Sequence, residues 1–169
     1  MLPAIPELIL TDSRPESRFP LHPLPGKPDT AAQPGDRLVL ILCHLQDGSC
    51  AQQVHPSLLA CLDGVHVLHP LTPPAGLLAH LESLCHHAGL GLMLDSEHLP
   101  ANFPLPSRPL PCRLDAVAPE DDPILPGALL VSCAPDTLTE VLSLFLQQGF
   151  DQIQVIGIFS AGETVIEIV

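Results

Sequence analysis

Residues 76–95 are the stretch that most constrains the fold, because they are typical of one helix followed by one strand. A helix can begin near Ala75, after two prolines, and its apolar side chains recur on one side at Leu77, Leu78, Leu81, Leu84 and Cys85. Gly89 supplies the left-handed residue that commonly ends a helix. Leu90 to Leu94 is then a short apolar run typical of a strand. The stretch therefore predicts a helix–strand layer.

The remainder of the domain repeats this alternation. Continuous apolar runs predict strands over residues 37–43, 65–69, 128–133, 152–159 and 164–169, the last one paired antiparallel to the one before it. A second helix opens near Asp136, with Thr137 and Glu140 as a capping pair, and Gly149 ends it. Two split β-α-β units predict an α+β fold, a mixed or antiparallel sheet with the helices packed on one face.

Proline marks the segments that lie outside this pattern. Residues 1–34 are rich in proline and carry few patterned apolar positions, so they are expected to be an arm or linker. Residues 100–126 are proline-rich again and are expected to form a long surface excursion. Residues 35–169 are therefore predicted to form a single α+β domain.

Composition excludes several classes of partner. The formal net charge is −13, from six Lys+Arg against nineteen Asp+Glu, and there is no Trp or Tyr. Phosphate backbones need clustered cations and bases need aromatic platforms, so no nucleic-acid partner is expected. No apolar run approaches the roughly 20 residues that span a bilayer, so no membrane association is expected. Cysteines within apolar runs, behind an N-terminus with no basic signal region, indicate free thiols and a cytoplasmic protein.

Three polar clusters invite a chemical interpretation, and none of them fits one well. His80, Cys85, His86 and His87 lack the spacing of a zinc site, and a surface pair of His80 and His87 beside a core cysteine is expected instead. Alternation places Cys43 and His44 on opposite faces of a strand, so Cys43 and Cys50 are expected to be structural thiols. Residues 120–122 are expected to be a solvated acidic run rather than a magnesium site. No catalytic residue and no metal ligand is predicted.

Four stretches in this order and spacing resemble a known family: residues 35–40, 76–95, 127–132 and 155–157 with the closing strand. They are similar to the C-terminal domain of the aminoimidazole-ribonucleotide synthetase superfamily, and within it to the selenide, water dikinases (selenophosphate synthetases). The resemblance covers roughly residues 34–169. It implies descent from enzymes that use ATP to activate an oxygen, selenium or carboxamide group.

The departures from the family concern its chemistry. The acidic and hydroxyl turn that precedes the first helix in the family corresponds to residues 70–76 here, with Thr72 and no aspartate. The second turn, at residues 122–127, keeps its Asp-Pro and one glycine and loses the hydroxyls. Thr72, Asp121 and Asp122 are the positions at which the resemblance leaves a nucleotide contact, with Glu120 beside them. The family's ATP-binding N-terminal half has no counterpart here, so ATP and Mg²⁺ are expected only with a partner half.

Three functions remain open on these grounds. The first is a divergent selenophosphate synthetase-like domain that is not catalytic alone and acts with a protein partner or as a homodimer. The second is a non-enzymatic binding or scaffold module. The third is a protein like the hydrogenase-maturation carbamoyl dehydratases, which residues 89–100 resemble. That branch relies on a C-terminal cysteine, whereas this chain ends in Glu-Ile-Val169.

Overall fold

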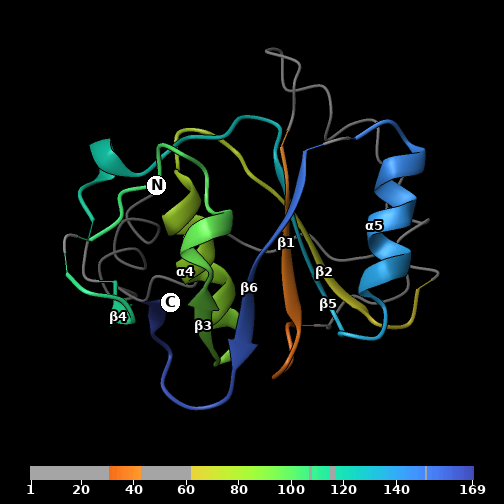
Figure 1. Ribbon diagram of the computed structural model, residues 1–169, viewed down its shortest axis with the longest axis horizontal. Coiled ribbons are helices and arrows are strands. Elements are labelled where there is room, and N and C mark those ends of the chain that lie inside the picture. Colours follow the sequence, from red (N-terminus) through yellow and green to blue (C-terminus); the bar gives the residue numbers. More distant parts are fainter. Residues whose placement is uncertain (1–30, 43–61, 107, 115–116, 151) are drawn as a thin grey trace, which may run out of the picture.

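A computed structural model describes residues 31–42, 62–106, 108–114, 117–150 and 152–169. Most of the predicted arm and the predicted structural thiols Cys43 and Cys50 lie outside these residues. The described chain forms one mixed sheet of seven strands with two α-helices, so the predicted α+β class is confirmed (Figure 1). Neither α-helix of the described residues is long and apolar enough to cross a membrane.

The sheet is built around β1. The strands are β1 (Arg37–Ile41), β2 (Val65–Pro70), β3 (Gly91–Leu94), β4 (Cys112–Arg113), β5 (Leu129–Cys133), β6 (Ile153–Ser160) and β7 (Ile166–Ile168). Their order across the sheet is β2-β5-β1-β6-β3-β7-β4. β1 pairs antiparallel with both β5 and β6, which makes it an inner strand with partners on both edges.

The pairing of the last strand differs from the prediction. β7 does not pair with β6; it lies parallel to β3 and antiparallel to β4. β3 occupies the place beside β6, with Met93 opposite Ile158. Because Leu92, Leu94, Ile166 and Ile168 all belong to one apolar cluster, the burial of both strands against the same helix favours this arrangement over a local hairpin.

The two helices lie on opposite faces of the sheet, which corrects the expectation that they share one face. α4 (Leu77–Ala88) packs on the face that carries Leu38 and Leu40, whereas α5 (Leu138–Gln147) packs on the face that carries Val39 and Ile41. In Figure 1 the helices accordingly stand on either side of β1. Four consecutive residues of β1 are therefore buried, to 1% exposure or less.

The glycines end the helices as predicted, but the predicted cap of α5 does not form. Gly89 follows α4 with a φ of +68° and Gly149 follows α5 with a φ of +92°. Thr137 is the N-cap residue of α5, yet its side chain makes no capping hydrogen bond. A Cβ placed on Gly64 would lie 1.8 Å from the Thr137 Oγ1. The Thr137 side chain thus packs over Gly64 instead of turning back to its own helix.

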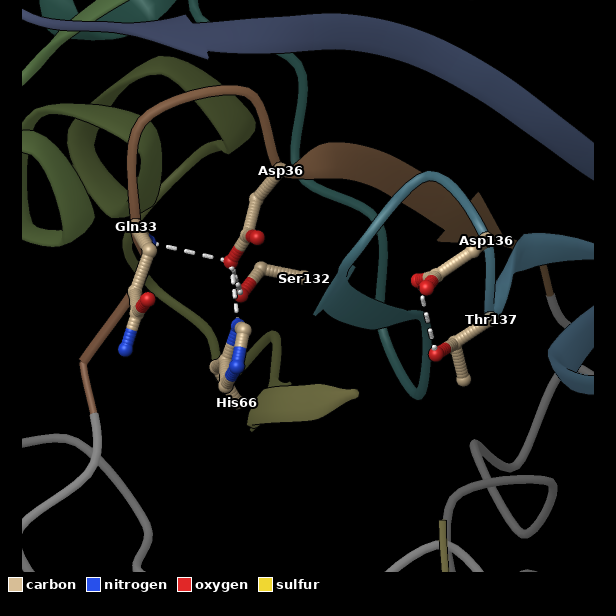
Figure 2. A network of polar contacts seen from close by, with 6 residues as sticks. All are labelled: Gln33, Asp36, His66, Ser132, Asp136 and Thr137. Carbon is tan, nitrogen blue, oxygen red and sulfur yellow. Dashed lines mark hydrogen bonds and ion pairs between the residues drawn. The ribbon is translucent and has the colours of Figure 1, made fainter. Parts of the chain in front are cut away.

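A buried carboxylate ties three segments together at the start of β1. The Asp36 Oδ2 accepts hydrogen bonds from the Gln33 amide (3.0 Å) and the Ser132 hydroxyl (3.3 Å), and lies 2.6 Å from the His66 Nδ1 (Figure 2). The Asp36 side chain is 3% exposed and that of His66 15%. One oxygen therefore holds the turn before β1, β2 and β5 in place.

We expect the substitution Asp36→Ala to lower the free energy of unfolding by about 3 kcal/mol, since it removes from the interior a carboxylate that contacts polar groups of three segments. Urea denaturation followed by circular dichroism measures this. Asp136→Ala is the matched control, because Asp136 is exposed and accepts a weak hydrogen bond of 3.5 Å from the hydroxyl of Thr137. Equal losses in the two variants would contradict a special role for Asp36.

Candidate functional site

The fold brings together the two loops that were expected to flank a ligand site. The Asp122 carboxylate crosses to the first turn of α4, where its Oδ1 accepts from the Leu78 amide (2.7 Å) and its Oδ2 from the Ala79 amide (3.0 Å). The carbonyl of Pro123 accepts from the Leu77 amide at 2.8 Å. Three of the amides that an α-helix leaves without an intrahelical partner are thus bound by one loop.

Gly76 makes this approach possible. A Cβ at this position would lie 2.3 Å from the Asp122 Cγ and 2.7 Å from its backbone oxygen. Any larger residue would therefore displace the carboxylate from the helix. The glycine that precedes α4 is required by its contact with Asp122, and not by an unusual φ, since its φ is −86°.

A pocket of about 660 Å³ lies beside this helix end. Its walls come from the first turns of α4 and from the loop of residues 117–122, and they consist of Pro74, Ala75, Gly76, Leu78, Ala79, Glu82, Val117, Pro119 and Asp122. The charged residues among these are Glu82 and Asp122, and both carry carboxylates. The helix end that commonly binds phosphate is therefore already occupied by a carboxylate of the chain itself.

The other two predicted contact residues lie close by, but they do not line this pocket. Thr72 has an exposed side chain, and its backbone amide and carbonyl both lie 3.3 Å from the His80 Nε2. Asp121 is exposed at the end of a short 3₁₀ helix, Pro119–Asp121. A nucleotide contact at Thr72, Asp121 and Asp122 stays a prediction.

His80 is not on the surface as predicted, but is buried between α4 and β2. Its Nδ1 lies 2.8 Å from the Nε2 of His69 on β2, and the two residues are 1% and 2% exposed. His87, the expected partner of His80, is exposed. Both histidines lie on α4, as the sequence predicted. The contact between His80 and His69 of β2, which the sequence does not reveal, accounts for the burial of His80.

Two of the described thiols, Cys85 and Cys133, are buried and unreactive. Burial, aided by the charge of Glu82, raises the pKa of Cys85 to about 12, and burial beside Asp36 raises that of Cys133 to about 11. Both stay protonated near neutral pH and are poor nucleophiles. Within the described ranges, no group of three or more His, Cys, Asp or Glu residues is placed to hold a metal ion.

Comparison with solved structures identifies the class of fold. The chain superposes on the HypE–HypF complex with a TM-score of 0.57 at 14% identity, covering 83% of this chain and 51% of that one. It superposes on T. maritima PurL complexed with ADP with a TM-score of 0.53 at 15% identity, covering 83% and 23%. The fold is that of the C-terminal domain of the aminoimidazole-ribonucleotide synthetase superfamily, as predicted.

Sequence comparison narrows this class to particular relatives. The chain is 36% identical over 135 residues to the selenide, water dikinase of Dechloromonas aromatica, and 34% identical over 134 residues to that of Paraburkholderia xenovorans. Each match covers 66% of this chain and 38% of the relative, so the chain spans well under half of these proteins. No protein-family model matches. The predicted resemblance to the selenide, water dikinases is confirmed.

We expect Asp122→Ala to lower the free energy of unfolding by about 1–2 kcal/mol, because it removes the acceptors from two amides of α4. Asp121→Ala removes the neighbouring exposed carboxylate and should change stability by less than about 0.5 kcal/mol. Urea denaturation of the two variants measures the difference. If both variants unfold at the wild-type midpoint, the cap contributes nothing to stability.

Acid should destabilise the chain through His80. Burial lowers the pKa of this histidine below its usual 6.5, so above pH 6.5 the ring is neutral in both the folded and unfolded chain. As the pH falls below 6.5, the unfolded chain gains a proton that the folded chain does not, and stability decreases until folded His80 is also protonated. We expect His80→Gln to flatten this part of the curve of unfolding free energy against pH.

His87→Gln, an exposed position on the same helix, is the control for this experiment and should keep the wild-type slope. Urea midpoints collected at several pH values between 7.5 and 5 provide the comparison. A slope that is identical in the wild type and in His80→Gln would assign the acid sensitivity to another group.

Proposed function

We propose that this chain acts as the C-terminal domain of a selenide, water dikinase-like enzyme, and that an ATP-binding half on a second polypeptide completes the site. The chain is not catalytic alone in this proposal, and it supplies one wall of the site. Its similarity to selenide, water dikinases over 38% of their length supports this assignment. The reaction of the assembled enzyme is then ATP-dependent phosphorylation of selenide.

The observation that carries the proposal is that a carboxylate of the chain itself occupies the N-terminal end of α4. Asp122 holds the Leu78 and Ala79 amides, and the pocket beside them is lined by carboxylates and apolar groups. A triphosphate needs cations and free donors around it. Those groups, together with the Mg²⁺ that neutralises the phosphates, would have to come from the partner half. Thr72 and Asp121 do not line the pocket themselves, and they are the groups of this chain proposed to approach the nucleotide.

The proposal has consequences for partners and location. A protein partner is required, and the solved HypE–HypF complex provides a precedent for partnering in a protein of the same fold. The described cysteines, Cys85, Cys112 and Cys133, are all free. Free thiols support a reducing compartment, and we propose the cytoplasm.

A non-enzymatic scaffold is the second candidate, favoured by the same carboxylate at the helix end. A domain whose phosphate-binding position is filled from within could keep the fold and the partner surface without the reaction. The two functions differ in one measurable respect. Both predict that a partner binds, but only the enzymatic function predicts that the assembled complex turns over ATP.

The test combines this chain with the separately expressed ATP-binding half of the Dechloromonas aromatica relative. We expect no heat from Mg·ATP with the chain alone in calorimetry, a complex of the two in size-exclusion chromatography, and selenide-dependent ATP consumption only in the mixture. Thr72→Val should lower that rate by about tenfold if the Thr72 hydroxyl donates a hydrogen bond to the transferring phosphates. Thr139→Val, which removes an exposed hydroxyl from the helix on the opposite face, is the control and should leave the rate unchanged.

Each outcome decides between the candidates. A complex without ATP consumption supports the scaffold and contradicts the enzyme. The absence of any complex contradicts both candidates. Heat from Mg·ATP with the chain alone would show that the chain binds the nucleotide although Asp122 occupies the helix end, and would contradict the proposal that a partner must supply the nucleotide-binding groups.

A further inference from the structure

Two buried histidines join the end of β2 to the first turns of α4. The Nε2 atom of His69 lies 2.8 Å from the Nδ1 atom of His80, and the centroids of the two rings are 4.9 Å apart. A distance of 2.8 Å between two nitrogens is that of a hydrogen bond. Because the residues are only 2% and 1% exposed, water does not compete for this bond, and each ring holds the other in one orientation.

The other ring nitrogen of His80 contacts the backbone of Thr72. Both the amide nitrogen and the carbonyl oxygen of Thr72 lie 3.3 Å from the His80 Nε2. The neutral ring accepts from the amide in one tautomer and donates to the carbonyl in the other. In either tautomer one proton lies between the two rings, and His80 uses both of its nitrogens. Thr72 is thus connected through His80 to His69.

This contact matters for the loop because of the residues that follow Thr72. Pro73 and Pro74 have no amide hydrogen, so neither of them can donate a backbone hydrogen bond. The residue before Thr72, Leu71, donates to the carbonyl of Ala128 at 2.9 Å. The buried ring therefore holds the chain at the last residue before the two prolines.

One turn of α4 fixes both of the loops that flank the candidate site. Leu78 and Ala79, the two residues before His80, donate their amides to Asp122 of the second loop. His80 holds the first loop by the backbone of Thr72, whose side chain is exposed. The helix thus binds one loop through its amides and the other through a buried side chain.

We propose that His69 and His80 are positioning residues, which together fix the backbone of Thr72 and thereby the place of its hydroxyl in the site. The inference rests on the proposed function, in which this hydroxyl approaches the transferring phosphates. Neither histidine touches the nucleotide, because both are buried. A displacement of about 1 Å in a positioned group lowers an enzymatic rate by up to about 100-fold, so the anchor of Thr72 is expected to control the rate.

Nuclear magnetic resonance of the free wild-type chain tests the anchor. We expect a scalar coupling between the His69 Nε2 and the His80 Nδ1 across their hydrogen bond. The Thr72 amide should be as rigid as the strands, with an order parameter of about 0.85. The absence of the coupling, or a mobile Thr72 amide, overturns the proposal. Neither measurement depends on the folding of a variant.

Variants of His69 test whether the pair is responsible for this rigidity. His69→Phe removes the ring nitrogens and should lower the order parameter of the Thr72 amide below about 0.6. His69→Gln places an amide group near the position of the Nε2 and should keep the wild-type value. His87→Phe, at an exposed position on α4, is the control. A rigid Thr72 amide in a folded His69→Phe chain, as judged by circular dichroism, overturns the proposal.

The complex with the ATP-binding half tests the consequence for the reaction. His69→Phe should lower the kcat of selenide-dependent ATP consumption by about tenfold, as Thr72→Val does, and His69→Gln should retain it. When Thr72→Val is already present, His69→Phe should lower the rate no further, because both changes act through the same hydroxyl. A structural role would instead lower the rate equally in both backgrounds, and that result overturns the proposal.

The two proposals fail in different ways. A complex of wild-type chains that does not consume ATP contradicts the proposed function, whereas the order of Thr72 in the free chain still decides whether the histidine pair fixes the loop. An active complex in which His69→Phe keeps the wild-type rate leaves the proposed function intact and overturns the positioning role.

Discussion

The position of β1 between two apolar layers is the constraint on which the rest of the structure depends. Its side chains alternate between the α4 cluster and the α5 cluster, so neither helix can be lost without exposing half of the strand. Asp36 fixes where this strand begins, because its carboxylate holds the preceding turn, His66 of β2 and Ser132 of β5. A one-residue shift of β1 would exchange its two faces, and it would also separate Asp36 from these partners.

The elements were predictable to the extent that their signals are local. The apolar stripe of α4, its stop at Gly89 and the apolar run of β1 all appear within a few residues of sequence. The continuous apolar run of β1 also indicates that both of its faces are buried, because a strand with helices on one face alone would alternate apolar and polar residues. The place of β7 had no local signal, because its pairing with β3 depends on a long-range choice between competing neighbours.

The candidate site shows the same limit at the level of side chains. The Asp-Pro pair at residue 122 placed the loop correctly, but the amides that Asp122 binds are 43 and 44 residues away. Thr137 and Glu140 matched a local capping pattern, and Thr137 instead packs over Gly64. His80 was predicted to lie on the surface beside His87, and it is buried instead, in contact with His69 of β2. In each case a tertiary contact outweighed a correct local pattern.

The two faces of the sheet differ in what they leave accessible, and this difference has a physical consequence. The face that carries α4 holds the pocket beside Asp122, whose charged lining groups are the carboxylates of Glu82 and Asp122. The opposite face carries α5 and its apolar cluster over β2, β5 and β1. A triphosphate in the pocket would be repelled by both carboxylates and would find the Leu78 and Ala79 amides already bound. The cations that would hold it there must therefore come from another protein, as the proposed function requires.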